Sequence, residues 1–578
     1  MARYIVDSQI DNHEKYYFIR EQESQDIVLL PSKYLMHKKR SKLSPNTIRR
    51  SAGAISYYLN YIDETGIQLD DVWEMPYNKQ QEHFTDYLIW LQAGLHQMKK
   101  GSVTVYMTWM LAVLLSLFVT VIEGARQRAI SIQAETAVDL AVYSVFAEYN
   151  RALFDAYDLL FIDTSYGEKT GSLARAKKHF SYYANENLMQ GQTAATADLT
   201  KCFLSDVSFP AYAYATDQKG AVFEKQAIRY MEQKYGLSYV AELKNELIAA
   251  KESGLLTRDV TAERQQNQRI IEETELPKKD TGKVDAEGNP VLEETELENP
   301  ADQVNGSRAK GVLLLVTDQK QHISEQSINP ARFSSHREGK QEGIGLTSRE
   351  QVKTAEKLLF DSYIMEKCSC FPDEEKDAGE LSYQLEYILG GKNSDIENLK
   401  YVVHRLLLIR EVSNVTYLFS DGTKMAEAAA MAFAVATAAG VPVLIEPIKI
   451  SLLFAWAYAE AVYDVRTLLA GGGVSLLKTA QNWHYSLEGM LQYEGDTSVK
   501  DTQEKKPGEL SYQEYLRLFL AAEGEEKKVL RMMDIVEMHL QTEDASFYLA
   551  DCVDYLSIQA EVGSKYGYSK ELERTFYY

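Results

Sequence analysis

A run of 20 consecutive residues without a charged side chain most constrains how this chain can fold. Residues 103–122 read VTVYMTWMLAVLLSLFVTVI. At about 1.5 Å per residue, a helix of this length spans about 30 Å, the thickness of the hydrocarbon core of a bilayer. Tyr106 and Trp109 lie near one end, as interfacial aromatic residues do. A buried core helix usually carries a polar stripe, which this run lacks. We therefore predict a transmembrane helix from Val103 to Ile122.

The charge is unevenly distributed along the 578 residues, whose net charge is −22. Residues 1–97 contain 11 Lys and Arg against 13 Asp and Glu, whereas the remaining residues contain 51 against 71. An acidic chain lacks the basic surface of a protein that coats nucleic acid. Only the nearly neutral N-terminal part leaves room for a local DNA contact.

A cluster of basic residues lies in that N-terminal part, because no Asp or Glu occurs between Asp26 and Asp63. Such a cluster is either a solvated basic loop or a phosphate-binding surface. The helices predicted around it favour the second interpretation. The cluster comprises Lys33 and the six candidate DNA-binding residues Lys38, Lys39, Arg40, Lys42, Arg49 and Arg50.

Two helices are predicted beside the basic cluster. Ser44-Pro45 is typical of an N-cap followed by a proline in the first turn. The apolar residues that follow have helical spacing and share one face; they are Ile48, Ala52, Ile55, Leu59 and Ile62. A second helix is expected from about Asn78, after the stop signal at residues 63–66.

This region resembles a known family through the segments KLSPNTIRRSAGAISYYLNYI and VWEMPYNKQQEHFTDYLIWL. They are similar to the N-terminal core-binding domain of tyrosine recombinases, or phage integrases. The resemblance implies a small helical DNA-clamping domain over residues 1–97. The sequence has no His-x-Leu-Arg-His motif, and Tyr577 and Tyr578 have no catalytic surroundings. We therefore expect no recombinase chemistry.

The membrane segment carries a second resemblance. MKKGSVTVYM at residues 98–107 and VIEGAR at 121–126 resemble the start of TadE/TadG-like proteins of Tad (Flp) pilus loci. The resemblance implies a cytoplasmic leader, an extracytoplasmic body and a possible processing site between Gly101 and Ser102. Tyr106 stands where that family has a glutamate used in assembly. We therefore expect a permanently anchored minor component.

Two further segments are expected between the membrane and the C-terminal half. Helical spacing continues past residue 129, so residues 124–257 should begin with a stalk helix. That helix is either unbroken to about residue 162 or kinked near Glu123-Gly124. Residues 258–308 contain the acidic near-repeats IEETEL and LEETEL with three prolines, which is typical of a disordered linker. Residues 310–316 read as a short buried strand.

Residues 309–578 are predicted to form a mostly helical domain. A capping box at residues 394–397 opens one helix, and residues 510–540 should form one or two amphipathic helices. The apolar runs at residues 428–459 are interpreted as a packed helix pair, with a membrane hairpin as the alternative. Two blocks, at residues 385–421 and 452–483, resemble an uncharacterised bacterial domain family that occurs with Tad-type secretion genes. That resemblance implies an architecture over residues 98–578 but no reaction.

No catalytic, metal-binding or cofactor-binding residue is predicted. The ten histidines are dispersed, and Cys368-Ser-Cys370 has the wrong spacing for a zinc site. The glycine-rich stretch at residues 471–475 lacks the lysine of a P-loop and is interpreted as a helix-ending loop.

Together these patterns predict a mainly α protein. A small N-terminal helical domain (1–97) precedes a basic leader and one transmembrane helix (98–123). A stalk, a linker and a mostly helical extracytoplasmic body with a minor β element follow. We hypothesise that the junction Gln97–Met98 joins two originally separate reading frames.

The expected function is that of a non-enzymatic, single-pass protein of the bacterial cell membrane with a cytoplasmic N-terminus. Its expected partners are the membrane, Tad/Flp pilus or secretion components, and DNA through residues 1–97. The alternatives are a DNA-binding accessory protein derived from a tyrosine recombinase and an unrecognised extracytoplasmic enzyme.

Overall fold

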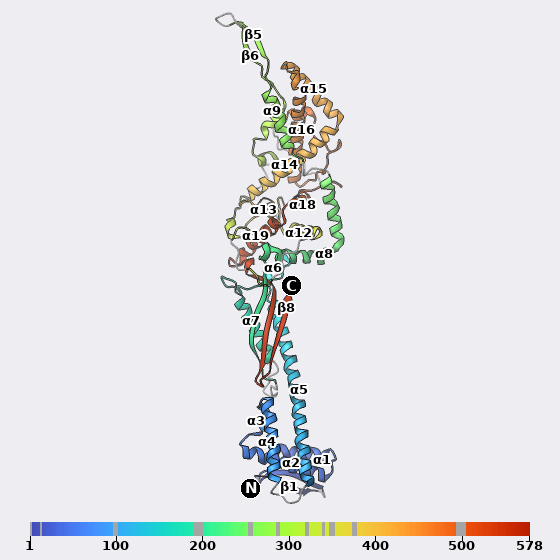
Figure 1. Cartoon of the computed structure of the whole chain (residues 1–578). Helices are drawn as coiled ribbons and strands as arrows, with labels where there is room; N and C mark the ends of the chain where they lie inside the picture. Colours follow the sequence, from blue (N-terminus) through green and yellow to red (C-terminus); the bar gives the residue numbers. More distant parts are fainter. Residues whose placement is uncertain are drawn as a thin grey trace. The chain divides into compact units, whose positions relative to one another are not determined.

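The computed structural model describes most of the chain and divides it into two compact units (Figure 1). Unit 1 comprises residues 1–147, 176–210 and 557–575, and unit 2 comprises residues 148–175, 211–556 and 576–578. Helix accounts for 62% of the structure and strand for 13%, so the predicted mainly α class is confirmed. The described residues are 3–11, 14–95, 102–189, 200–252, 258–284, 290–317, 323–337, 342–345, 353–372, 379–492 and 505–578.

Unit 1 begins with a small module of one β-hairpin and four helices. Strand β1 (Tyr4–Asp11) pairs antiparallel with β2 (Glu14–Glu21), and this hairpin was not predicted. The hairpin and helices enclose a core that includes Ile19, Leu35 and Leu91. The helices are α1 (Leu29–Arg40), α2 (Pro45–Thr65), α3 (Leu69–Glu74) and α4 (Tyr77–Leu95).

Helix α2 confirms the predicted start and face. The Ser44 side chain accepts a hydrogen bond from the Thr47 backbone N–H, and Pro45 occupies the first turn. The helix ends at Gly66, whose φ of 70° is in the left-handed region that glycine adopts without strain. Ile48 and Leu59, from the predicted apolar face, are buried in the core.

Helix α5 (Ser102–Phe146) is continuous over 45 residues, about 70 Å, so neither predicted form of the stalk is correct. It passes Gly124 without a break and ends well before residue 162. Asn150 then starts a new helix, α6 (Arg151–Tyr157), by accepting a hydrogen bond from the Leu153 N–H. The junction Gln97–Met98 and Gly101 lie outside the described residues.

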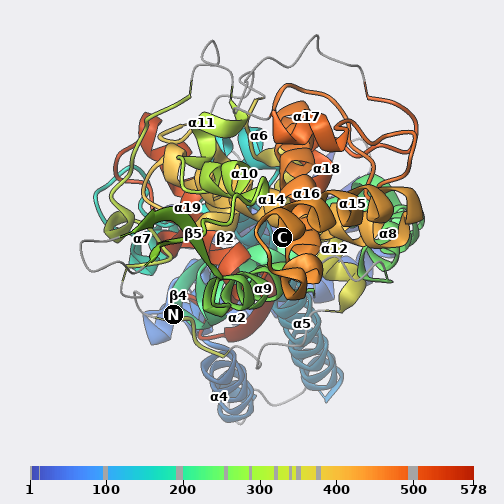
Figure 2. The same cartoon turned by 90° about the horizontal axis from the view of Figure 1, so that it is seen from above.

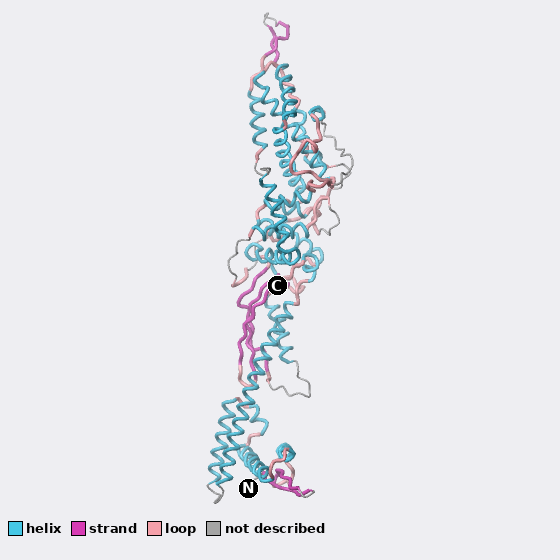
Figure 3. The backbone as a smooth tube through the Cα atoms, turned by 90° about the vertical axis from the view of Figure 1, so that its right-hand side faces the viewer, coloured by secondary structure: helices cyan, strands magenta, loops and turns pink. Residues whose placement is uncertain are grey.

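A four-stranded sheet includes residues from the middle and the end of the chain. Strand β7 (Cys552–Ser564) pairs with β4 (Cys202–Tyr214), with β8 (Ser569–Tyr577) and, at its start, with the short β3 (Ile162–Asp163). The part of this sheet in unit 1 lies beside the second half of α5 (Figures 1 and 3). Helix α7 (Leu173–Met189) contacts α5 as well, because the Gln133 side chain donates to the Leu188 carbonyl.

Unit 2 is built mainly from helices around one large core. Helix α14 packs on α16, which also packs against α15, and Figure 2 shows these three helices side by side. Trp456 of α16 is fully buried at their centre. The helices are α8 (Asp217–Glu252), α9 (Val260–Glu273), α10 (Ala301–Ser307), α11 (Val312–Val316), α12 (Thr354–Lys367), α13 (Gln384–Gly390), α14 (Asp395–Ser420), α15 (Gly422–Ala438), α16 (Ile445–Leu469), α17 (Leu487–Leu491), α18 (Tyr512–Ala522) and α19 (Glu525–Glu543).

The segment 258–308, predicted to be a disordered acidic linker, instead contains regular structure. Helix α9 is followed by the antiparallel strands β5 (Lys278–Val284) and β6 (Pro290–Glu294) and then by α10. Asp259 caps α9 by accepting a hydrogen bond from the Ala262 N–H, and Asn267 donates to the Pro447 carbonyl. The cap of α9 and its contact with α16 therefore stabilise regular structure in this segment despite its acidic composition.

The predicted strand at residues 310–316 is also wrong, because this run forms the short helix α11. Leu313, Leu315 and Val316 are buried in the core of unit 2, and Arg466 donates to the Leu315 carbonyl. Periodicity alone does not separate a short apolar strand from a short buried helix. The largest sheet of the described residues is formed by β3, β4, β7 and β8, beside the two-stranded pairs β1–β2 and β5–β6.

The helix predicted to start at residues 394–397 is confirmed as α14, which begins after Ser394, but the predicted capping box is wrong because the Ser394 side chain makes no cap hydrogen bond. The remaining helix predictions for the C-terminal half are confirmed. The runs at residues 428–459 form the packed pair α15 and α16, and residues 510–540 form α18 and most of α19. Helix α16 ends at Leu469, and the predicted loop follows with Gly471 in the left-handed region.

Candidate functional site

The basic surface is formed by the seven cations predicted between residues 33 and 50. Five of them belong to α1 or the turn after it, and Arg49 and Arg50 lie near the start of α2. The last turn of α1 holds Lys38, Lys39 and Arg40, where the helix dipole favours positive charge. The local fold therefore brings the predicted cluster together.

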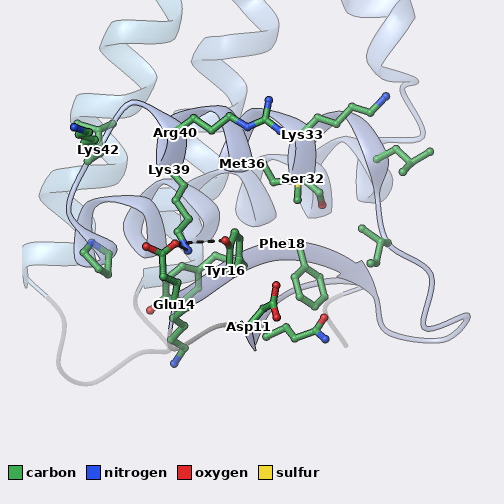
Figure 4. Close-up of a pocket in the computed structure, with 17 residues that line it drawn as sticks. Asp11, Glu14, Tyr16, Phe18, Ser32, Lys33, Met36, Lys39, Arg40 and Lys42 are labelled. Carbon is green, nitrogen blue, oxygen red and sulfur yellow. Dashed lines mark hydrogen bonds and ion pairs between the residues drawn. The ribbon is translucent and has the colours of Figure 1, made fainter.

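A cavity of about 1150 Å³ lies between β2 and α1 and shares part of the basic surface (Figure 4). Lys39 points into it, with its Nζ 2.8 Å from a carboxylate oxygen of Glu14 and 3.1 Å from the ring centroid of Tyr16. The Lys39 ammonium lowers the pKa of Glu14. Asp11 also lines the cavity, so it carries both signs of charge and is a poor cradle for phosphate.

The remaining cations of the basic surface differ in their availability. Lys38 is half-buried, and its Nζ donates to the Ser51 hydroxyl at 3.3 Å. In contrast, Arg40, Lys42, Arg49 and Arg50 are exposed and make no ion pair with any residue that the structure describes. These four side chains are the part of the predicted DNA-binding set that could contact a phosphate backbone.

The predicted transmembrane segment forms the first half of α5, and its apolar side chains are largely uncovered. Among residues 104–122, only Thr108 and Ala112 are buried. Large apolar side chains such as Trp109, Leu117 and Phe118 are more than half exposed. A continuous exposed apolar surface of this kind marks contact with a membrane or with another protein.

Helices α5 and α16 are the two described helices that are long and apolar enough to cross a membrane, and they differ in burial. In its most apolar window, α5 has 11% of its residues buried, whereas α16 has 67%. The apolar surface of α16 is already used by the core of unit 2. Of these two helices, only α5 keeps an exposed apolar surface.

One side of the apolar half of α5 contacts α2 and α4. A cavity of about 500 Å³ remains between them, lined among others by Tyr58, Phe84, Leu111, Leu115 and Phe118. In a bilayer the same face of α5 would contact acyl chains. Membrane insertion and this contact therefore exclude each other, and an inserted chain would have to release the N-terminal module from α5.

The end of the apolar segment is marked by a charged pair. Glu123 and Arg126 form an ion pair of 2.7 Å, in which both side chains are largely buried. The Arg126 guanidinium lies 4.1 Å from the ring centroid of Tyr566, in the turn between β7 and β8. These two residues belong to the Ile-Glu-x-x-Arg stretch at residues 122–126, and the contact of Arg126 with Tyr566 attaches the hairpin of β7 and β8 to α5. At the other end, Ser102 is the first residue of the helix, and Tyr106 is exposed.

A buried charge cluster in unit 2 was missed by sequence reasoning. The Arg410 guanidinium is fully buried and donates to Asp464 at 3.0 Å and to the Tyr515 hydroxyl at 2.9 Å. The Lys478 ammonium donates to Asp464 and to Glu460, each at 2.7 Å. Arg410 also donates to the carbonyls of residues 475 and 476, so the cluster holds the loop after α16 against α14.

Other buried titratable groups also have structural partners. Burial raises the pKa of Glu386 to about 7, although the Tyr512 hydroxyl and the Phe371 N–H both donate to this carboxyl. All four cysteines are buried, and none forms a disulfide within the described residues. Within the part of the chain that the structure describes, no group of three or more His, Cys, Asp or Glu residues could hold a metal ion.

Comparison with protein families gives a match in the C-terminal half. Residues 291–564 match the model of a family described as a family of unknown function (DUF5702). The matched segment contains the whole buried charge cluster and all of β7. No curated protein and no solved structure is significantly similar to the chain. The C-terminal half is thus similar to a family whose function is unknown.

Proposed function

We propose that this chain is a single-pass membrane protein of bacteria whose helical body lies outside the cytoplasm. The first half of α5 is the membrane anchor, and the N-terminal module remains in the cytoplasm. The body has a non-enzymatic role as an accessory or minor component of a Tad-like pilus or secretion system.

The change in burial along α5 carries this proposal. Residues 104–122 are apolar and largely exposed, whereas Ala134, Ala137, Ala141 and Val145 in the second half are buried within unit 1. A single rigid helix thus joins an uncovered apolar segment to a folded body. The hydrocarbon core of a bilayer has the same thickness as the length of this exposed apolar segment, so lipid is the expected surrounding.

The orientation and the pilus role rest on resemblance. Residues 98–126 are similar to the start of TadE/TadG-like proteins, and the Glu123–Arg126 pair of that element joins the anchor to the body. Blocks within residues 291–564 are similar to a family that occurs with Tad-type secretion genes.

Protease shaving of spheroplasts tests the orientation. If the body is extracytoplasmic, added protease removes peptides from residues after 123 while those from 14–95 stay protected. Protection of the body in intact spheroplasts would contradict the proposal. Co-purification with pilus or secretion components after crosslinking then tests the assembly role, with the chain lacking residues 557–578 as a comparison.

A second candidate function is DNA binding by the N-terminal module. The exposed cations Arg40, Lys42, Arg49 and Arg50, which lack carboxylate partners among the described residues, favour it. Each could neutralise one phosphate, which gives binding that weakens steeply with salt. Salt-dependent binding of the full chain to duplex DNA, and its loss on substitution of the basic surface, tests this function.

A further inference from the structure

The C-terminal hairpin, formed by β7 and β8, contacts α5 at three successive positions along the helix. Nearest the apolar segment, Arg126 contacts Tyr566. Further along, Lys570 pairs with Glu135, and Arg574 pairs with Asp139. Strand β8 therefore runs beside α5, with the turn of the hairpin directed toward the apolar segment and its C-terminal end directed away from it.

This arrangement fixes the level of the hairpin turn relative to the proposed bilayer. Ile122 is the last residue of the apolar run, and Arg126 is one turn further, about 6 Å along the helix axis. The headgroup layer on each side of the hydrocarbon core is about 5–8 Å thick. A turn that contacts Arg126 is therefore at the level of the lipid headgroups whenever residues 103–122 span the core.

The residues near this turn are Lys, Arg and Tyr, the types that are common where a protein meets lipid headgroups. We name the set comprising Arg128, Lys201, Lys565, Tyr566 and Tyr568 the collar; Arg128 lies about 9 Å along the helix axis from Ile122, at the outer edge of this layer. Arg128 and Lys565 are exposed, and the backbone N–H of Lys565 bonds to the carbonyl of Lys201, which brings the chain before β4 beside the turn. Burial, followed by the nearby Glu123 carboxylate, raises the pKa of Tyr568, so this residue stays a neutral phenol.

Lys201 belongs to the collar although it has other contacts. Its Nζ lies 5.7 Å from the ring centroid of Tyr566 and 3.0 Å from a carboxylate oxygen of Glu74 in the N-terminal module. The module would have to leave α5 on membrane insertion, and this ion pair would then be lost. The Lys201 ammonium would still lie near the Tyr566 ring, beside the hairpin turn.

We propose that the collar binds the phosphate headgroups of anionic lipids on the outer face of the membrane and so fixes the body against the bilayer. This inference rests on the proposed function, because it requires that residues 103–122 span the membrane. Lys and Arg attract anionic lipid, and the half-buried Tyr568 is of a residue type that prefers the interface between water and hydrocarbon. Tyr566 is buried and positions the turn through its contact with Arg126. The residues after 97 carry an excess of 20 acidic charges, so attraction to an anionic surface has to come from a local group of cations such as this one.

A depth measurement tests the position of the collar. The full chain is reconstituted in nanodiscs containing phosphatidylglycerol, with a single fluorophore on an engineered cysteine; the four native cysteines are buried. Lys565→Cys reports on the hairpin turn, Leu117→Cys on the anchor, and Gln559→Cys on β7, about 20 Å from the turn. Lipids with a spin label at the headgroup quench fluorophores at that level.

The proposal predicts strong headgroup quenching at position 565, little at 559, and quenching at 117 by lipids labelled deep in the acyl chain. Equal, weak headgroup quenching at 565 and 559, together with quenching at 117 by deeply labelled lipids, would contradict the proposed position of the collar. The same result would still support the membrane anchor. Absence of deep quenching at 117 would instead overturn the proposed function.

Lipid selectivity tests the chemistry. Hydrogen exchange of the amides at residues 564–568 is compared in nanodiscs of phosphatidylcholine alone and with phosphatidylglycerol added. Each basic residue at an anionic surface contributes about a fivefold factor, so anionic lipid should slow exchange at least about fivefold, and added salt should reverse this.

A charge-removal variant and its matched control complete the test. The variant Arg128→Gln, Lys201→Gln, Lys565→Gln should lose the lipid effect. The control Lys169→Gln, Lys177→Gln, Lys178→Gln removes the same charge from exposed residues elsewhere and should keep it. An equal lipid effect in both variants, or none in the unmodified chain, would overturn the proposal.

Discussion

The guanidinium of Arg126 lies 4.1 Å from the ring centroid of Tyr566, so the C-terminal hairpin is attached to α5 one turn beyond the apolar run. Glu123 pairs with the same guanidinium at 2.7 Å. The contact links the last strands of the chain to the proposed membrane anchor. It gives the Ile-Glu-x-x-Arg element a structural role.

Tyr566→Leu should weaken this attachment. Leucine keeps the apolar contact but removes the aromatic face, and a largely desolvated cation–π interaction stabilises by about 1–2 kcal/mol. Hydrogen exchange of the hairpin amides at 557–575 should become faster by a corresponding factor of about tenfold. Tyr566→Phe keeps the ring and is the control. Equal protection in the two variants would show that the cation–π contact contributes nothing.

Leu117→Arg should impair membrane insertion. An arginine at the centre of a membrane helix disfavours insertion by about 2.5–3.5 kcal/mol. Leu140→Arg is the matched control, because Leu140 is 44% exposed on the same helix but lies beyond the apolar run. Carbonate extraction should release more of the first variant than of the second. Identical extraction of both would argue that the apolar surface has a protein partner instead of lipid.

Arg410→Met should destabilise the body of unit 2. The change leaves Asp464 and the Tyr515 hydroxyl without their guanidinium partner, and removing one member of a buried ion pair costs about 3–5 kcal/mol. Arg405→Met is the control on the same helix, since its pair with Glu523 is partly exposed and should contribute about 1 kcal/mol or less.

Limited proteolysis of the loop at residues 471–485 checks this prediction, because the buried cluster holds that loop. The Arg410 variant should be cut at lower urea concentration than the Arg405 variant. Cleavage of both at the same concentration would mean that the cluster does not stabilise the loop.

Glu386 should make the body less stable as the pH rises. Its pKa is raised from 4.5 to about 7 in the folded protein, so the folded state binds more protons than the unfolded state between these values. Glu386 alone therefore leaves stability unaffected below about pH 4.5 and lowers it by about 3 kcal/mol as the pH rises to and beyond 7. The Tyr512 hydroxyl can still donate to the amide oxygen in Glu386→Gln.

Urea unfolding between pH 5 and pH 8 measures this effect. Glu386→Gln should reduce the fall in stability relative to the unmodified chain, whereas the exposed Glu397→Gln should not. The comparison uses differences because burial also raises the pKa values of Asp361, Asp534 and Asp554 to about 6. An unchanged pH dependence in Glu386→Gln would contradict the prediction.

Arg49→Ala with Arg50→Ala tests the DNA-binding candidate. Each arginine that neutralises a phosphate contributes about 0.9 to the slope of log affinity against log salt, so the double variant should lower the slope by about 2. Lys79→Ala, on the exposed side of α4, is the control. If the slope is the same in all three proteins, the basic surface does not bind DNA.

Local signals in the sequence predicted the parts of the fold that local chemistry determines. Ser44-Pro45 and Gly66 delimit α2, and the uncharged run delimits the apolar half of α5. The basic surface follows from neighbouring positions in the chain. In each case the residues that specify the structure lie within a few turns of one another.

Contacts between distant residues could not be predicted in this way. Strand β7 pairs with strands from the middle of the chain, and no local pattern identifies those partners. Arg410 meets Asp464 and Lys478 only through the packing of α14 on α16 and the loop after it. Composition also misled at residues 258–308, where the cap at Asp259 and a hydrogen bond to α16 support structure in an acidic segment.

Cysteine labelling in spheroplasts tests the central claim, that residues 103–122 cross the membrane with the body outside, most directly. Asp206→Cys places an exposed thiol on the body, and Lys79→Cys places one on the N-terminal module; the native cysteines are buried. An impermeant maleimide should label position 206 in intact spheroplasts and position 79 only after permeabilisation. Labelling of both positions, or of neither, before permeabilisation would contradict the claim.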